Sequence, residues 1–217
     1  LFPFFRNPLF FWVKSGITIH MEILEKVFGS AARVKVMRLF LLNKTKNFNP
    51  KDIAKRSRIN PPSLRKELRL LESIEFIKKR ASGYTFNDTF KYTNEFEGLL
   101  VSSSTVDVPG LGSQFKKVGR VKLLVVSGVF IKNKESRVDI LVVGDNIKKG
   151  KVEEEIRKLE ALMGVEMVYA LFTTKEFIYR LNMYDKLVRD ILDFPHEVII
   201  QAKELSTQTA NSSRKLI

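Results

Sequence analysis

NPKDIAKRSRINPPSLRKELRLLESIEFIKKRASGYTFN, residues 49–87, is the stretch that decides the fold of the first half of the chain. It contains two Asn-Pro pairs, at residues 49–50 and 60–61. Asparagine is a good N-cap, and the fixed φ of proline suits the first position of a helix. The pattern therefore predicts a helix over residues 50–56, a tight turn, and a second helix that begins at residue 61.

The second of these helices has one apolar side and one basic side. Leu64, Leu68 and Leu71 recur at the spacing of a single helical face, which predicts that they are buried. The outward side carries Ser63, Arg65, Lys66 and Arg69. A charged helix face is most often only a solvated surface. Here, however, the spacing of the two helix starts is typical of a helix-turn-helix, in which the second helix is the recognition helix.

A basic β-hairpin is predicted directly after the second helix. Residues 76–80 (FIKKR) and 84–87 (YTFN) have the composition of strands and flank a turn at residues 81–83 (ASG). The hairpin carries Lys78, Lys79 and Arg80. Two capped helices, a basic helix face and a basic hairpin thus follow one another in the order that DNA binding requires.

Residues 21 to about 92 resemble the winged helix-turn-helix domain of small bacterial and archaeal transcriptional regulators. Besides the helix pair and hairpin, the resemblance includes MEILEKVFGSAARVKVMRLFLLN at residues 21–43, where Gly29-Ser30 separates two helices and Ser30 caps the second. It implies that the helix from Pro61 enters the major groove and that the hairpin, as the wing, holds the DNA backbone. The implied contacts to bases or phosphates are Ser63, Arg65, Lys66 and Arg69 on the helix, Lys78, Lys79 and Arg80 on the wing, and Arg56 and Arg58 near the turn as phosphate contacts.

The charge of the chain is strongly positive and unevenly distributed. The formal net charge of the 217 residues is +14. Residues 21–92 contain 17 Lys or Arg against 7 Asp or Glu, whereas residues 120–205 contain 15 against 14. A polyanion such as double-stranded DNA is therefore expected to bind the first half. An anionic membrane surface is the weaker alternative, because the cationic helix face carries no exposed Trp or Phe that could insert.

Residue types exclude several classes of site. The chain has no cysteine, so disulfides, iron-sulfur clusters and thiolate zinc sites are excluded. Two histidines, His20 and His196, cannot form a histidine-rich metal site. No uninterrupted apolar run reaches the roughly eighteen residues of a membrane span. We expect a cytoplasmic protein with no cofactor and no membrane association.

Composition also predicts how the chain is divided. Residues 1–20 crowd six aromatic residues between prolines and charges; we interpret them as a non-native or disordered extension before a natural start at Met21, with a functional anchor as the alternative. The predicted units are a winged helix-turn-helix domain at 21–100, a linker at 101–119, a small α/β domain at 120–205 and a disordered tail at 206–217. The expected fold class is α+β with two domains.

The second half alternates strands with helices. Apolar runs predict strands at residues 121–130, 137–144, 165–172 and 197–200, and the 3.6-residue period predicts a helix at residues 151–163. Thr173 and Glu176 have the spacing of a capping box for a further helix, which is expected to continue through residues 184–192. A short helix is also expected at residues 92–100, capped by Thr93 or Asn94. The order indicates an α/β domain with a mixed sheet.

This order resembles the minimal nucleotidyltransferase fold, in which a Gly-Ser pair holds the phosphates and three carboxylates hold Mg²⁺. Asp139 matches the second carboxylate and Glu166 could lie near the third, but Arg137 replaces the first. Residues 127–128 read Ser-Gly, the reverse of the expected pair, and the strand is expected to continue past them. We therefore interpret the domain as catalytically degenerate. The simpler interpretation of Asp139 is a strand-end carboxylate paired with a nearby Lys or Arg.

These observations predict a DNA-binding transcriptional regulator that acts as a homodimer, with a non-catalytic second domain for dimerisation or ligand sensing. No metal-binding or catalytic residue is assigned, and the sequence specifies no small-molecule effector. One alternative is an active Mg²⁺-dependent nucleotidyltransferase that acts on protein or RNA and is targeted by the winged helix. Another is a protein-interaction module, since winged helices also bind proteins.

Overall fold

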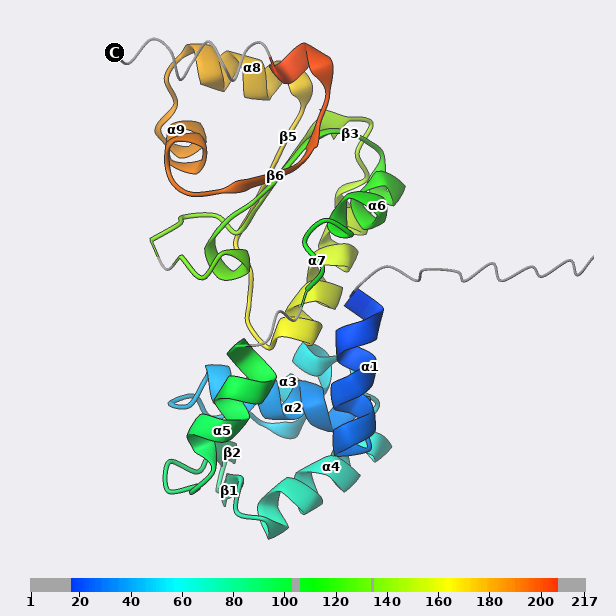
Figure 1. Cartoon of the computed structure of the whole chain (residues 1–217), viewed down its shortest axis with the longest axis vertical. Coiled ribbons are helices and arrows are strands. Elements are labelled where there is room, and N and C mark those ends of the chain that lie inside the picture. The colour runs from blue at the N-terminus through cyan, green and yellow to red at the C-terminus, as the bar shows by residue number, and fades with distance from the viewer. Residues whose placement is uncertain (1–16, 103–105, 134, 207–217) are drawn as a thin grey trace, which may run out of the picture.

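The computed structural model describes residues 17–102, 106–133 and 135–206 (Figure 1). It combines helices with a mixed β-sheet, as the sequence predicts. Within those residues no helix is both long enough and apolar enough to cross a membrane. Most of the predicted N-terminal extension, residues 1–16, and almost all of the predicted tail, residues 207–217, lie outside the described residues.

The first half of the chain is mostly helical and ends in a two-stranded hairpin. Its elements are α1 (Ile17–Phe28), α2 (Ala31–Leu42), α3 (Pro50–Ser57), α4 (Pro61–Ser73), β1 (Ile77–Arg80), β2 (Gly83–Phe86), α5 (Thr93–Glu97) and the π-helical turn η1 (Gly98–Ser102). Phe40 of α2, Leu71 of α4 and Phe76 are fully buried in one apolar cluster. The hairpin therefore packs on the same core as the helix pair.

The second half of the chain contains the four-stranded sheet. Its elements are α6 (Leu111–Phe115), the 3₁₀ turn η2 (Lys116–Val118), β3 (Arg120–Val126), the 3₁₀ turn η3 (Gly128–Phe130), β4 (Ile140–Asp145), α7 (Lys149–Met163), β5 (Tyr169–Phe172), α8 (Thr174–Asn182), α9 (Lys186–Asp193) and β6 (Glu197–Gln201). The strand order is β5-β4-β3-β6; β3 is antiparallel to both β4 and β6, and β4 is parallel to β5.

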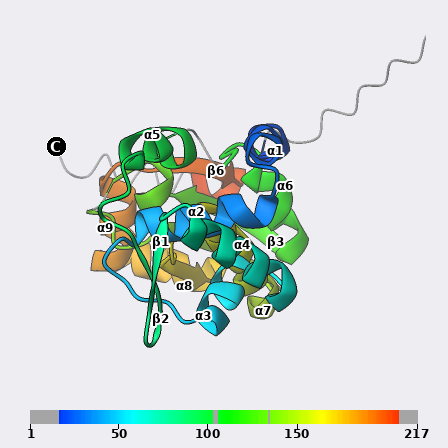
Figure 2. The same cartoon turned by 90° about the horizontal axis from the view of Figure 1, so that it is seen from below.

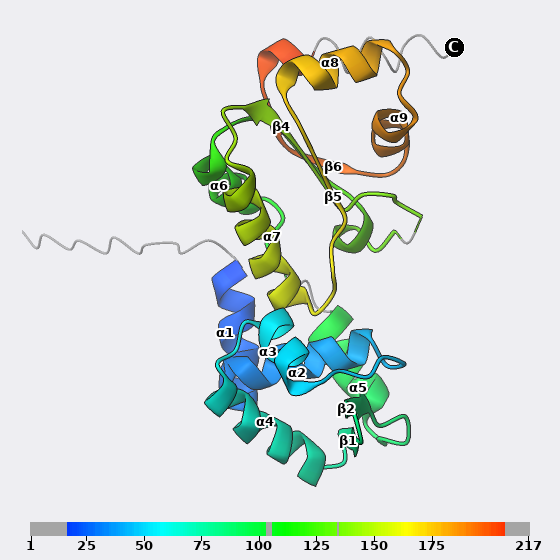
Figure 3. The ribbon, with the colours of Figure 1, turned by 180° about the vertical axis from the view of Figure 1, so that it is seen from behind.

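Helices cover both faces of this sheet. Alternate residues of β3 point to opposite sides, so Leu124 and Val126 pack in one buried cluster with α6 and α7. Leu123 and Val125 pack in the other cluster, with α8 and α9. The central strands β3 and β4 are therefore buried on both faces, which explains their nearly continuous apolar sequences. Seen from behind, α7 runs from the sheet down to α2 and α3 of the first half (Figure 3).

Buried polar contacts fix this junction between the halves. Nε of Arg38 in α2 donates to the carbonyl of Leu100 at 2.8 Å, and one Nη donates to the carbonyl of Leu162 in α7 at 3.2 Å. Nδ2 of Asn43 donates to the carbonyl of Gly164 at 2.9 Å. Gly164 ends α7 with φ +79°, and a Cβ at this position would lie 2.8 Å from the backbone of Arg38. Only glycine fits this approach without strain.

The predicted strand ends in the second half are wrong in three places. The first strand ends at Val126 and not at Phe130, because Gly128 takes φ +53° and the chain turns into η3. The second strand begins at Ile140 and not at residue 137. The third begins at Tyr169 and not at residue 165, since residues 165–168 form the passage from the end of α7 to the sheet.

Helix ends also differ from prediction. The segment predicted as a linker contains α6, whose Leu111 and Phe115 are fully buried under the sheet, so this part belongs to the second core. α5 is preceded by Tyr92, with no side-chain cap from Thr93 or Asn94. α8 ends at Asn182, and Asp185 caps α9 as a separate helix. The first helix, α1, begins at Ile17.

Candidate nucleic-acid interface

The cap and the first residue of α4 are those that the sequence predicts. The side-chain oxygen of Asn60 accepts from the N–H of Ser63 at 2.9 Å, and Pro61 occupies the first helical position. Asn49 caps α3 in the same way, by accepting from the N–H of Asp52 at 2.9 Å. Leu64, Leu68 and Leu71 are buried, which confirms the inward face of α4. The opposite face of α4 is therefore turned to solvent.

The outward face of α4 carries three exposed cations. Arg65, Lys66 and Arg69 are exposed, and they line an open groove with Pro62, Leu70 and Ser73. Ser63 is half-buried at the start of the helix. Within the described part of the chain, none of these three cations forms an ion pair with an acidic side chain. Their positive charge is thus uncompensated at short range.

An acidic residue of α4 is kept away from this face. Glu67 is buried on the inner side of the helix, where its carboxylate accepts from Nε of Arg33 at 2.8 Å. Arg33 also donates to the carbonyl of Phe28. The sequence analysis did not single out this pair, although Glu67 lies three residues after Leu64 and so shares its helical face. The pair joins α4 to α2 and keeps this carboxylate off the outward face, where half-buried Glu72 is the acidic residue of α4 that follows Arg69.

The β1–β2 hairpin carries the second group of predicted contacts. Arg80 pairs with Gly83, so the turn has two residues and not the predicted three. Lys79 and Arg80 are exposed and Lys78 is half-buried, and none has an acidic partner among the residues that the structure describes. The hairpin therefore presents at least two cations near its tip.

A close backbone contact fixes the hairpin relative to α3. Phe48, just before α3, exchanges two backbone hydrogen bonds with Tyr84 of β2, at 3.0 and 2.9 Å. A Cβ at Gly83 would lie 2.3 Å from the carbonyl oxygen of Phe48, and the φ of Gly83 is +155°. This position therefore requires glycine. The contact couples the position of the hairpin to that of the helix pair.

α4 and the hairpin lie at the same end of the molecule. Figures 1 and 3 show both at the end opposite the four-stranded sheet. In the view onto that end, α4 and the β1–β2 hairpin both face the viewer (Figure 2). The two elements that carry the predicted DNA contacts therefore lie at one end of the molecule. The predicted contacts are Arg65, Lys66 and Arg69 on α4, and Lys78, Lys79 and Arg80 on the hairpin.

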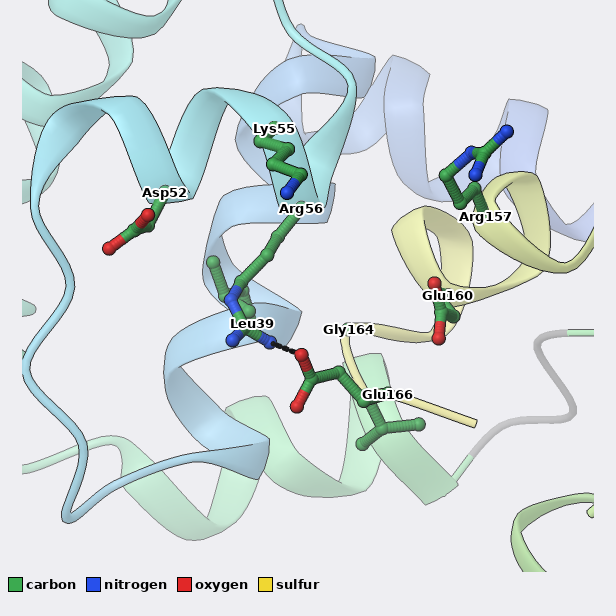
Figure 4. A pocket seen from close by; sticks show the side chains of 9 residues that line it. Leu39, Asp52, Lys55, Arg56, Arg157, Glu160, Gly164 and Glu166 are labelled. Carbon is green, nitrogen blue, oxygen red and sulfur yellow. Dashed lines mark ion pairs between the residues drawn. The ribbon is translucent and has the colours of Figure 1, made fainter. Parts of the chain in front are cut away.

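Arg56 and Arg58, the predicted phosphate contacts near the turn, both form ion pairs. Each is paired with an acid of the second half. Nη1 of Arg56 lies 2.7 Å from a carboxylate oxygen of Glu166, and Nη2 of Arg58 lies 2.6 Å from one of Glu154 on α7. The pairs span long sequence separations, so local pattern could not reveal them. The Arg56–Glu166 pair borders a cleft of about 320 Å³ between α3 and the end of α7 (Figure 4).

The Arg58–Glu154 contact is a hydrogen-bonded ion pair. The bond from Arg58 holds the pKa of Glu154 below its ordinary value, and the same bond raises the pKa of Arg58. Both groups are therefore charged at neutral pH. Because both side chains are partly exposed, the stabilisation from this pair is modest.

The two acids matched to the nucleotidyltransferase pattern have separate partners. Asp139 is buried, and its two oxygens accept from the backbone N–H groups of Val129 at 2.9 Å and Val168 at 2.8 Å. Its partners are thus backbone amides and not the expected Lys or Arg. Glu166 pairs with Arg56. No group of three or more His, Asp or Glu residues that could hold a metal occurs within the described ranges.

Comparison of the chain with protein-family models, curated proteins and solved structures found no match. Both family resemblances therefore stay predictions. Any functional argument depends on the geometry of the described residues, above all on the cations of α4 and the hairpin.

Proposed function

We propose that the chain is a DNA-binding transcriptional regulator. The observation that carries the proposal is the gathering of unpaired cations on the exposed sides of α4 and the β1–β2 hairpin, at one end of the molecule. Exposed cations without acidic partners favour binding to a polyanion, since each phosphate neutralised releases counterions. Because the second half is nearly neutral, a polyanion is attracted mainly to the first half, which carries this end.

The proposed docking follows from the shape of this end. α4 is a thirteen-residue helix with a free outer face, and an α-helix fits the major groove of B-DNA. Arg65 and Arg69 lie four residues apart on that face, so they project from successive turns of the helix. Arginine can bind guanine O6 and N7 with two hydrogen bonds, whereas the hairpin cations are suited to phosphates. In this proposal the hairpin is the wing of a winged helix-turn-helix.

We assign regulatory roles to the second half of the chain. A cavity of about 480 Å³ lies between the halves and has a largely apolar lining that includes Leu42, Leu100, Val129, Met163 and Val165. Its size and apolar lining suit a small molecule, and small-molecule sites often occur at domain junctions. The cavity supports ligand sensing as one role. Dimerisation through the second half is the other role that we propose, because dimers read two half-sites of an operator.

We rank the alternative of a working nucleotidyltransferase below this proposal. Both oxygens of Asp139 already accept from backbone amides, and Glu166 faces Arg56 across the cleft. Mg²⁺ bound by these acids would have to replace those contacts. Incubation with labelled nucleoside triphosphates and Mg²⁺ tests the alternative: transfer of label that depends on Asp139 would reverse the ranking.

Selection of bound duplexes from a random pool tests the proposal. We expect enrichment of a common sequence, together with salt-sensitive affinity for duplex DNA measured by fluorescence anisotropy. Salt-sensitive binding without enrichment would support DNA binding but remove sequence-specific regulation. Absence of any salt-sensitive affinity for duplex DNA would contradict the proposal and favour a protein-interaction module.

A further inference from the structure

Two arginines at the turn between α3 and α4 are held by carboxylates of the second half. Arg58 follows α3 in the left-handed conformation, with φ +52°, and lies two residues before Asn60, the cap of α4. Arg56 lies in the last turn of α3. Their partners, Glu154 and Glu166, lie on α7 and just beyond its end. The pairs thus join the start of the recognition helix to the second half.

A carboxylate and a DNA phosphate bind a guanidinium in the same way. Both accept hydrogen bonds from its fork of N–H donors, so one guanidinium donor cannot be fully shared between them. Arg58 is within three residues of the N-terminus of α4, which in a helix-turn-helix lies close to the DNA backbone. At this position Glu154 competes directly with a phosphate for Arg58.

We propose that Glu154 and Glu166 form an autoinhibitory contact: they substitute for phosphates on Arg58 and Arg56 and lower the affinity of the chain for DNA. This inference depends on the proposed DNA-binding function and adds its regulation. When a duplex docks on α4, its backbone displaces the two carboxylates and takes over the two arginines. The second half of the chain therefore sets the affinity of the first.

The contact is weak enough to be displaced. The side chains of Arg58 and Glu154 are 37% and 39% exposed, and Glu166 is 65% exposed, so solvent and salt screen both pairs. Exposed pairs of this kind change an equilibrium by at most about fivefold each. Arg56 also lies over the ring of Phe48, 5.3 Å from its centroid, and stays positioned after Glu166 leaves.

Release of these pairs does not require the halves to separate. The buried bonds from Arg38 to the carbonyls of Leu100 and Leu162, and the bond from Asn43 to Gly164, involve neither glutamate. The junction thus has a fixed buried part and an exposed charged part. Only the exposed part exchanges partners when DNA binds.

The test is to neutralise each glutamate without changing its size and to measure affinity for a random-sequence duplex by anisotropy. We expect Glu154→Gln and Glu166→Gln each to tighten binding by about two- to fivefold. Glu176→Gln is the matched control. Glu176 also pairs with an arginine, Arg180, but within α8, so its substitution removes the same charge far from α3. Circular dichroism shows whether each variant is folded.

A double-mutant cycle assigns the gain to the freed arginine. Arg58→Ala alone should change affinity little, since the side chain is already occupied, and it should abolish the gain from Glu154→Gln. The inference is overturned if the glutamate variants bind no tighter than the control, or if the gain persists without Arg58. Loss of binding in Arg65→Ala/Arg69→Ala reports separately on the proposed function. If neither the unaltered chain nor the glutamate variants bind DNA, both proposals fail; if only the glutamate variants bind, the autoinhibitory contact is upheld.

Discussion

Replacing Arg65 and Arg69 together by alanine should weaken binding of duplex DNA without unfolding the chain. Both side chains are exposed and unpaired with acids in the described part of the chain, so their removal costs no buried contact. If the cations of α4 and the hairpin neutralise about five phosphates, log K falls against log salt with a slope of about −4 to −5. Loss of two contacts should reduce the steepness by about 1.8.

The difference is measurable by anisotropy titrations with one labelled duplex at several salt concentrations. From about 0.05 to 0.2 M salt, the unaltered chain should lose about tenfold more affinity than the double variant loses. Lys175→Ala/Lys186→Ala is the charge-matched control, since both lysines are exposed in the second half of the chain. An unchanged slope in the α4 variant, or an equal change in the control, would refute the assignment of α4 as the DNA-binding face.

Three further predictions concern the scaffold and are checked by urea unfolding. Arg38→Met should lower the free energy of unfolding by about 2 to 4 kcal/mol, because the buried carbonyls of Leu100 and Leu162 lose their donor. Gly164→Ala should destabilise the chain by more than about 1 kcal/mol because its Cβ meets the backbone of α2, whereas Gly150→Ala, in open space within α7, should be neutral or stabilising. The hydrogen bond from Lys122 is the main cause that lowers the pKa of Asp145 below its ordinary value of 3.8. The contribution of ionised Asp145 to the free energy of unfolding is therefore present above pH 3.8 and is lost as the pH falls further. Between pH 7 and pH 3, the free energy of unfolding should fall less in the Asp145→Asn variant than in the unaltered chain.

Features that depend on adjacent residues were predictable from the sequence. Ser30, Asn49, Asn60 and Thr173 all cap helices in the structure, and each accepts from a backbone N–H three residues later. The leucine stripe of α4 is buried as its spacing indicates. A cap is determined within one turn of helix, and the spacing of the leucines indicates which face of the helix the rest of the core covers.

Features that depend on distant residues were not predictable. The apolar residues after Val126 predict a longer strand. In the structure the N–H of Val129 donates to the carboxylate of Asp139, and the chain turns there. Likewise, the charges of Arg56 and Arg58 read as free, because their acidic partners lie about a hundred residues away in the sequence. Composition gives the sign of a charge but not its partner. The cations of α4 and the hairpin are therefore exposed as predicted, whereas those near the turn are paired with carboxylates.

The buried guanidinium of Arg38 has a consequence for how the chain melts. Pulling the halves apart while both cores stayed folded would expose apolar side chains and remove the donor of the Leu162 carbonyl, whereas the bond from Arg38 to Leu100 lies within the first half and would remain. Such a half-open species is costly, since it loses the bonds from Arg38 to Leu162 and from Asn43 to Gly164 together with the apolar contacts between the halves. The two cores should therefore melt cooperatively, with one calorimetric peak whose enthalpy equals the van't Hoff value.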